Sequence, residues 1–320
     1  MKKQIQHTLK WIKILLVGFV LLSLSACGLL YQQKEIDSYV VGPNELLAKD
    51  YRFDRLQIRR FLNVEEVYSV DDEQELALLV MKNFEVGIMR TSYVSDQTLT
   101  LQRVYLFLET LLYDSFYLQA GVIAQVDSLG EDPYQTKFID VVVDEGRLEK
   151  SMQYSKQIIQ ELNINELDQK EQIKQIHDYL VLNTEYDEEL LQLDISTYQN
   201  HPSFTPFGVY ENNTAVCSGY ARAFVQLSAQ LNIPAVMISS QNMNHAWNMV
   251  YLDEEWLFLD ATWNDPIPDQ KGRVLNTYYL LTLDQMKSIG HHFFDLASSQ
   301  TLGIEEVVEF AEFAFAIENE

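Results

Sequence analysis

The sequence is poor in the residues that define several whole classes of protein. Only 12 glycines and 7 prolines occur among its 320 residues, which excludes a collagen-like or low-complexity chain. Lysine and arginine total 23 against 47 aspartates and glutamates, and the resulting net charge of −24 would repel a phosphate backbone. We therefore expect no nucleic-acid partner.

Large apolar side chains, by contrast, are plentiful. Hydrophobic residues make up 47% of the chain, and they include 16 phenylalanines, 18 tyrosines and 4 tryptophans. Such a composition excludes disorder as the dominant state and predicts buried cores. At the usual size of a domain, a chain of 320 residues is expected to form about two domains.

The first 27 residues have the charge pattern of an exported leader. Four lysines precede an apolar run over residues 14–24, and no acidic residue occurs before Glu35. The run is shorter than the ~20 residues that a spanning helix needs. The lysines are Lys2, Lys3, Lys10 and Lys13.

Directly after that run, Leu24-Ser25-Ala26-Cys27 resembles a bacterial lipobox. The resemblance implies that residues 1–26 are a lipoprotein signal peptide and that diacylglycerol is attached to the sulfur of Cys27. We therefore expect a protein anchored by its N-terminal lipid to the outer face of a bacterial cell membrane, because two or more acyl chains anchor stably. An ordinary secretory signal or a short anchor is the alternative.

The mature chain divides into four parts by composition. Residues 27–63 are predicted to be a polar tether, in which Arg52, Arg55, Arg59 and Arg60 form a solvated helical face. Residues 64–143 are predicted to mix helices with strands, and residues 144–295 to form the second folded region. Residues 296–320 are predicted to be an acidic tail, with helical spacing of apolar residues from Ile304 to Ile317.

Apolar spacing predicts the elements inside these parts. Helices are expected around 76–84, 101–112, 148–162 and 173–181, with Asp168 capping the last of these. Strands are expected over 116–126 and 138–143. Residues 186–213 are predicted to be a long polar loop, and loops of that length are often functional.

Cys217 is predicted to lie at the start of a helix. Residues 214–231 have the pattern of a loop that enters a helix, and Pro234 follows its end. Unpaired backbone N–H groups at a helix start favour thiolate over thiol. Gly219 is predicted to leave space beside the sulfur for a substrate backbone. If Cys27 carries lipid, Cys217 has no disulfide partner within the chain, and a buried, inert cysteine is the simpler alternative.

Two aromatic-rich runs predict a hairpin that brings a histidine and an aspartate together. Strands are expected over 245–252 and 255–263, joined at Asp253-Glu254. In this register His245 lies opposite Thr262, and Asp260 lies diagonally across on the same face. With Cys217 these residues would form a Cys-His-Asp nucleophilic system, in which Asp260 orients His245. Taken singly, His245 is more simply explained as a core histidine, and Asp260 as a structural hydrogen-bond acceptor.

Three segments then resemble the catalytic motifs of the bacterial transglutaminase-like superfamily. They are Thr214 to Ala221 (TAVCSGYA), Asn244 to Asn248 (NHAWN) and Trp256 to Trp263 (WLFLDATW). Weaker similarity extends over residues 144–294. The resemblance implies an α+β, papain-like or transglutaminase-like core, with the nucleophile helix on an antiparallel sheet and a mixed α/β region preceding it.

The same resemblance implies roles for three residues. Cys217 would be the nucleophile, His245 the base and Asp260 the orienting acid. No metal or organic cofactor is implied, and the calcium sites of animal relatives have no counterpart here. The expected activity is thiol acyl transfer through a thioester, as a protease or amidase or as a transglutaminase. The expected partner is a protein or peptide, for example in the cell wall or on the surface.

Several residues keep a second interpretation. A surface binding module that retains these residues only for packing is the rival to an enzyme. His177 is predicted to be a core imidazole bonded to backbone. Trp247, Trp256 and Trp263 are predicted to pack on a sheet face, although one of them could wall the acyl site. His291 and His292 suggest a metal, but adjacent histidines point apart and lack a third ligand.

Overall fold

The computed structural model describes residues 54–59, 64–112, 116–122, 136–190, 201–291, 297–298 and 300–317. Cys27 and the expected leader lie outside these residues, so lipidation stays a prediction. Within the described part, no helix combines the length and the apolar character that crossing a membrane requires.

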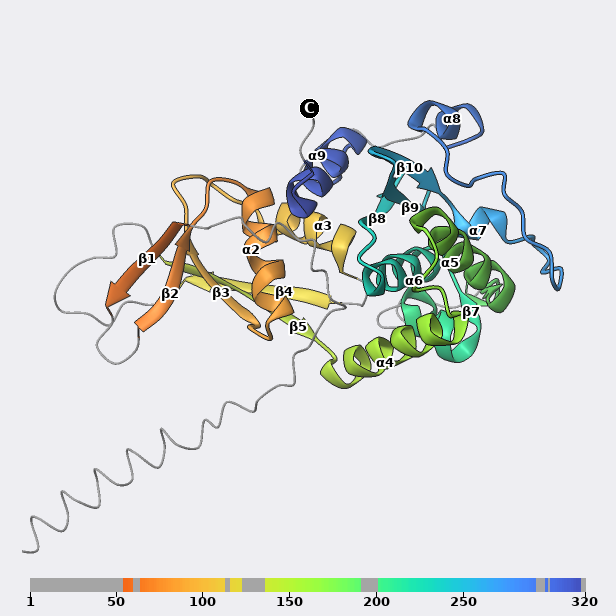
Figure 1. The fold of residues 1–320 in the computed structure, drawn as a ribbon. Helices are drawn as coiled ribbons and strands as arrows, with labels where there is room; N and C mark the ends of the chain where they lie inside the picture. Colours follow the sequence, from red (N-terminus) through yellow and green to blue (C-terminus); the bar gives the residue numbers. More distant parts are fainter. Residues whose placement is uncertain are drawn as a thin grey trace, which may run out of the picture. The chain divides into compact units, whose positions relative to one another are not determined.

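The N-terminal region is built on a five-stranded sheet in the order β1-β2-β3-β5-β4 (Figure 1). Strands β2 and β3 run parallel and are joined through a helix, whereas the other neighbours are antiparallel. The strands are β1 Asp54–Arg59, β2 Val64–Ser69, β3 Arg90–Val94, β4 Phe116–Val122 and β5 Lys137–Val143.

Strand β1 corrects the prediction of a tether that ends at residue 63. Arg55 and Arg59 belong to this strand, which pairs with β2 over six residues, and not to a solvated helix. Leu56 and Ile58 alternate with polar neighbours, and this two-residue period is typical of a strand. Backbone pairing with β2 then satisfies the peptide groups on the side of β1 that faces β2.

The helices of this region were predicted correctly. Helix α2, Glu73–Glu85, begins at Asp72, whose side chain accepts a hydrogen bond from the Glu75 N–H. Helix α3, Leu101–Leu111, buries Val104, Phe107 and Leu108. Their apolar stripes therefore form a core beside the sheet.

The second region packs helices against a three-stranded antiparallel sheet in the order β10-β9-β8. Helices α4 and α5 are capped by Asp144 and by Asp168, the latter as predicted. Helix α6 packs on β8 and β9. The elements are α4 Glu145–Leu162, α5 Gln169–Asn183, α6 Cys217–Gln230, β8 Ala235–Ser240, β9 His245–Leu252 and β10 Glu255–Leu259.

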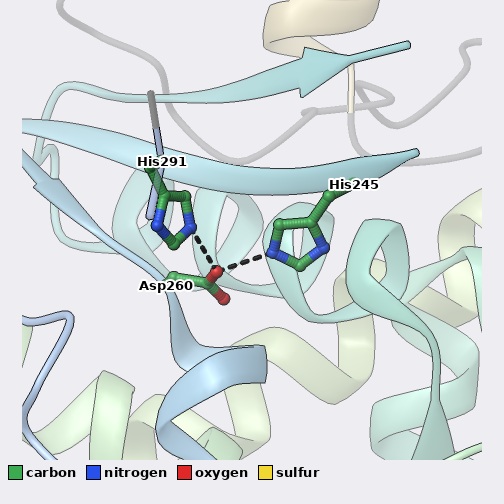
Figure 2. Close-up of side chains that lie close together, drawn as sticks. All are labelled: His245, Asp260 and His291. Carbon is green, nitrogen blue, oxygen red and sulfur yellow. Dashed lines mark hydrogen bonds and ion pairs between the residues drawn. The ribbon is translucent and has the colours of Figure 1, made fainter. Parts of the chain in front are cut away.

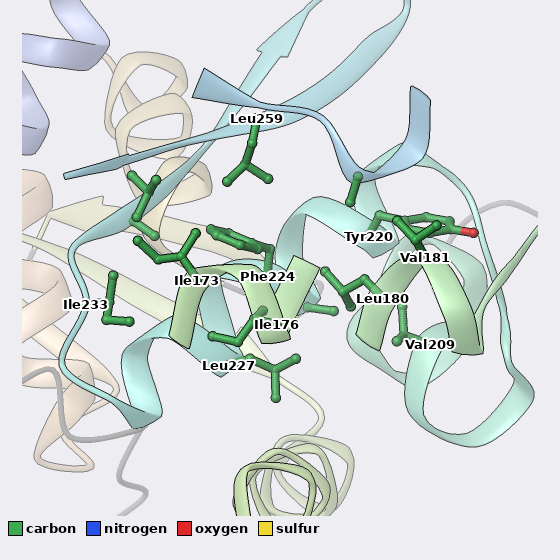
Figure 3. Packing of buried hydrophobic residues seen from close by; sticks show 14 of the residues in the cluster. Ile173, Ile176, Leu180, Val181, Val209, Tyr220, Phe224, Leu227, Ile233 and Leu259 are labelled. Atoms are coloured by element: carbon green, nitrogen blue, oxygen red, sulfur yellow. The ribbon is translucent and has the colours of Figure 1, made fainter. Parts of the chain in front are cut away.

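The core of the second region holds α6 in place. Tyr220, Phe224 and Leu227 of α6 interleave with residues of α5 such as Ile176 and Leu180 (Figure 3). All five are buried. The helix that starts at Cys217 is thus clamped between α5 and the sheet. This is the expected α+β architecture, with the candidate nucleophile helix on an antiparallel sheet.

The described part of the predicted 186–213 loop is more structured than expected. It contains the short helices η3, Pro202–Phe204, and η4, Gly208–Asn212. Strand β6, Glu185–Tyr186, pairs in parallel with β7, Thr214–Ala215, immediately before Cys217. Hydrogen bonds local to each turn explain why apolar periodicity does not reveal them.

The C-terminal helix α9, Ile304–Phe315, confirms the predicted helix but is a packed element and not a free tail. Phe310 is fully buried and contacts Phe107 of α3, with ring centroids 4.8 Å apart. Arg103 pairs with Glu306 across the same contact.

Candidate active site

Cys217 is the first residue of α6, as predicted. Val216 before it is extended and donates its N–H to the carbonyl of Ser203 at 3.0 Å, which fixes the entry to the helix. The thiol is partly exposed and unbridged. This position places Cys217 in the helical turn whose backbone N–H groups have no partner within the helix.

Gly219 does not leave space for a substrate. A Cβ there would lie 2.3 Å from the Ser203 carbonyl oxygen, so the glycine serves close packing of η3 on α6. The prediction is corrected because another segment of the chain already fills that space.

His245 begins β9, and the hairpin register is the predicted one. Glu255 pairs with Leu252, and Leu259 with Asn248. The turn residues Asp253 and Glu254 have φ values of 52° and 67°. This left-handed pair makes a two-residue turn without glycine, and its twist suits a hairpin.

Asp260 reaches His245 by a different route from the one predicted. Strand β10 ends at Leu259, and Asp260 caps the short helix α7, Ala261–Asn264, so that no strand extends to Trp263. Its Oδ1 accepts the Trp263 N–H at 2.9 Å, and its Oδ2 lies 2.6 Å from His245 Nε2. The contact between Asp260 and His245 is therefore the expected one. It arises because Asp260 caps α7, and not because the two residues are diagonal neighbours on paired strands.

The three predicted residues therefore come together. Burial lowers the pKa of His245, but the charge of Asp260 and the hydrogen bond to it outweigh burial, and the pKa is raised. The neighbouring Cys217 side chain raises the pKa of His245 further. Because Nε2 is bonded to Asp260, Nδ1 is the ring nitrogen left for the sulfur.

Asp260 is kept ionised despite complete burial. Burial raises its pKa, but the charge of His245, the hydrogen bond to His245 and a hydrogen bond to His291 together lower it. A carboxylate in this state accepts hydrogen bonds and stabilises a neighbouring imidazolium.

His291 is the residue that sequence reasoning missed. Its Nε2 lies 2.8 Å from Asp260 Oδ2, the oxygen that also contacts His245 (Figure 2). It follows helix α8, Leu283–Ser288, and is fully buried. No spacing rule links residues 31 positions apart, so its adjacency to His292, which lies outside the described residues, was the only signal.

His245, Asp260 and His291 also have the spacing of a metal-binding set, with one ligand atom each within 4.8 Å of the others. Histidine and carboxylate ligands suit zinc or iron. Hydrogen bonds of 2.6 and 2.8 Å account for the same proximity, and they occupy the atoms a metal would need. We therefore assign the three side chains to a hydrogen-bonded cluster.

Aromatic rings enclose this cluster. Trp247 and Trp263 both stack on His245, with ring centroids 5.8 and 5.0 Å away. Trp247 is buried, as predicted, whereas Trp263 is 36% exposed and forms the outer wall of the site. Trp263 thus has the site-lining position that was the alternative to sheet packing.

His177 is a core residue, as predicted, but its partners are side chains and not backbone. Its Nδ1 lies 2.9 Å from Asp178 Oδ1, and its Nε2 lies 2.9 Å from the Asn264 amide nitrogen. Asn264 also donates to the carbonyl of Tyr278, which accepts the Asp260 N–H. His177 thereby supports the segment that carries Asp260.

Comparisons with known proteins show what part of the chain resembles. Residues 156–261 match the family model of the transglutaminase-like superfamily. This segment is a transglutaminase-like domain. Cys217, His245 and Asp260 all lie inside the match, and His291 lies outside it.

Two curated relatives match part of the chain. The Kyphoscoliosis peptidase of Mus musculus is 25% identical over 150 residues, which is 41% of this chain and 22% of that protein. Its Homo sapiens counterpart is 26% identical over 132 residues, covering 35% and 20%. This chain therefore spans about a fifth of the length of these relatives.

Solved structures are similar at a lower level. A crystal structure of a TGase has 16% identity and a TM-score of 0.36, covering 68% of this chain and 60% of that one. A putative cysteine protease from Cytophaga hutchinsonii has 15% identity and a TM-score of 0.27, covering 52% and 72%.

Proposed function

We propose that the transglutaminase-like domain catalyses thiol acyl transfer on a protein or peptide, and that lipid on Cys27 anchors the chain to the outer face of a bacterial cell membrane. The single observation that supports catalysis is the imidazole of His245, which is bonded to Asp260 through Nε2 and whose pKa is raised by the neighbouring Cys217 at a helix start.

In the first half-reaction, His245 takes the thiol proton through Nδ1 and the sulfur attacks an amide carbonyl. The S–C bond forms, and the C–N bond breaks as the imidazolium gives its proton to the leaving amine. The backbone N–H of Cys217 is a donor for the developing oxyanion. Asp260 fixes the tautomer of His245 throughout.

In the second half-reaction, water or an amine attacks the thioester carbonyl while His245 takes its proton through Nδ1. The S–C bond breaks, and the Cys217 thiolate leaves. Water gives peptide or amide hydrolysis, and an amine gives an amide cross-link. Both outcomes use the same three residues, so the acceptor depends on the pocket and on the exclusion of water. The peptidase named among the relatives favours hydrolysis as the first assay.

Alkylation of the full-length protein tests the nucleophile without a known substrate. Native protein is treated with iodoacetamide at pH 5–6, and peptide mapping by mass spectrometry separates Cys217 from Cys27. We expect rapid labelling of Cys217 that His245→Ala abolishes while the fold persists. Labelling of Cys217 only after denaturation would contradict the proposal and favour a non-catalytic surface binding module.

The acceptor is tested by two parallel incubations. One contains a glutamine donor peptide and a fluorescent amine, and the other contains a peptide library in water. Incorporation of the amine identifies a transferase, whereas cleaved peptides identify a hydrolase. Cys217→Ser is the control in both, because it keeps the size of the side chain and removes the thiol.

The anchor has its own test. Cells that express the full chain are grown with labelled palmitate, and the label on the protein is measured. Cys27→Ser should abolish incorporation and release the protein from the membrane fraction, whereas Cys217→Ser should change neither. Equal incorporation into wild type and Cys27→Ser would contradict the lipid anchor.

A further inference from the structure

His291 is delivered to the site by a tight reversal of the chain after α8. Its backbone N–H donates to the carbonyl of Met286 at 3.1 Å. Gly290 before it has a φ of +122°, a conformation that favours glycine. The turn directs the imidazole toward Asp260 from the side opposite His245 (Figure 2).

The contact with Asp260 defines the protonation state of His291. An ionised carboxylate only accepts, so His291 Nε2 must carry the hydrogen at the 2.8 Å contact. Its Nδ1 is buried and has no partner among the described residues. A second proton there would bury an unpaired cationic N–H group, and that is costly. The ring is therefore a neutral donor.

We propose that His291 is a positioning residue of the active site: its Nε2–H holds Oδ2 of Asp260 in line with the Nε2–H of His245. The inference rests on the function proposed above. His291 acts through Asp260 and does not act on the reacting atoms itself.

Asp260 needs a donor at Oδ2 because the backbone N–H of Trp263 holds only its other oxygen, Oδ1. The Trp263 N–H holds Oδ1, and the two imidazoles contact Oδ2. Without His291, the carboxylate could rotate about its Cβ–Cγ bond, and Oδ2 would then move out of line with the Nε2–H of His245. Two donors on one oxygen define its direction.

A neutral donor suits this task better than a cation would. Lysine or arginine at this position would neutralise Asp260 and repel the imidazolium that forms on His245. His291 contributes a hydrogen bond and leaves the charge of the carboxylate available to that imidazolium. Its neighbours Trp247, Trp263 and Tyr278, with centroids 5.1, 4.2 and 5.1 Å away, keep the ring in this orientation.

Two substitutions in the full-length protein separate positioning from mere packing. His291→Phe keeps an aromatic ring and removes the donor, whereas His291→Gln places an amide N–H near the position of Nε2. The readout is the rate of Cys217 alkylation by iodoacetamide from pH 4 to pH 9. We expect His291→Phe to lower the rate at pH 6 by roughly 10- to 100-fold and to narrow the reactive pH range. His291→Gln should recover most of the rate.

Thermal unfolding and near-ultraviolet circular dichroism establish that each variant is folded. NMR of ¹⁵N-histidine-labelled wild type is a second measurement that needs no folded variant. It should show His291 as the Nε2–H tautomer, with Nδ1 unprotonated at neutral pH. A ring that carries no hydrogen on Nε2 would overturn the inference.

The outcomes also separate this inference from the proposed function. If wild-type Cys217 is reactive at pH 6 and a folded His291→Phe variant matches it, only the role of His291 is overturned. If wild-type Cys217 is inert, the proposed function fails and the positioning role fails with it. If His291→Phe does not fold, rescue by His291→Gln and the tautomer decide.

Discussion

Two acidic residues, one in each folded region, respond to burial in opposite ways. Glu85 ends helix α2 in the N-terminal region, where burial raises its pKa to about 8 and the charge of Lys82 lowers it only in part. Asp260 in the transglutaminase-like domain is fully buried, yet its pKa is lowered.

The difference lies in the donors that surround each carboxyl group. One oxygen of Glu85 is buried with no partner among the described residues, whereas Asp260 accepts from His245, His291 and the Trp263 N–H. Burial alone therefore protonates an acid, and burial with assembled donors keeps it charged. Only the second environment can stabilise a neighbouring imidazolium.

The largest expected effect comes from Asp260→Asn. The amide keeps the volume but loses the charge that raises the pKa of His245, so alkylation of Cys217 at pH 6 should fall by roughly 10²- to 10⁴-fold. The free energy of unfolding should fall by roughly 3 kcal/mol, because the two buried imidazoles lose the charge of their shared acceptor. Alkylation kinetics and urea unfolding measure the two effects, and wild-type labelling rates in a folded variant would refute the assignment.

The pH dependence of this loss has a definite sign. The lowered pKa of Asp260 contributes stability above its unfolded pKa near 4, and this is lost as the pH falls. The raised pKa of His245 contributes stability below about 6.5, and this is lost as the pH rises through its folded value. We therefore expect the free energy of unfolding of Asp260→Asn, measured from pH 3 to pH 10, to lack both of these pH-dependent contributions.

The next effect concerns how tightly each region packs around a glycine. In Gly219→Ala the new Cβ would meet the backbone carbonyl of Ser203 at 2.3 Å, so we expect a loss of about 1–3 kcal/mol and slower alkylation of Cys217. In Gly121→Ala of β4 it would meet the ring of Phe138 at 2.8 Å, and a ring can shift. That variant should lose less than about 1 kcal/mol. Equal losses in urea unfolding would mean that η3 adjusts as readily as a side chain.

Glu85→Gln should have the opposite sign to Asp260→Asn. The raised pKa means that stability falls as the pH rises from about 4.5 to about 8, and glutamine removes this dependence. We expect a gain of roughly 1–2 kcal/mol at pH 8, reduced by solvent screening, and no gain at pH 4. Thermal unfolding of wild type and Glu85→Gln at pH 4 and pH 8 checks this expectation. Lower stability of the variant at pH 8 would show that ionised Glu85 has a partner.

The predictability of the fold from sequence follows from the range of the interactions involved. Stripes such as Leu76 to Phe84, and caps such as Asp168, depend on neighbours within a few residues, and these helices were correct. Strand β1 was missed because its alternating pattern holds only two apolar residues, Leu56 and Ile58, and the pairing with β2 that supports it is not visible in the sequence. The helices η3 and η4 were missed because hydrogen bonds local to each turn define them.

The sequence predicts those residues of the site that lie in recognisable motifs or in a hairpin of defined register. Cys217, His245 and Asp260 were found from a helix start, a hairpin and a family resemblance. The role of Asp260 as the cap of α7 was not, because strand periodicity does not reveal where a strand ends. His291 was not, because only the folded turn after α8 brings it to Asp260.

The smallest effect is expected from the best-formed ion pair of the N-terminal sheet. Asp140 of β5 binds Arg90 of β3 through two hydrogen bonds of 2.7 and 2.6 Å, a geometry as short as that of His245 with Asp260. The Arg90 side chain is 53% exposed, so water already solvates its charge. Asp140→Asn should therefore change the free energy of unfolding by less than about 1 kcal/mol and leave Cys217 alkylation unchanged. Urea unfolding beside Asp260→Asn makes the comparison direct. A loss as large as that of Asp260→Asn would mean that bond geometry, and not burial, decides how much each acid contributes.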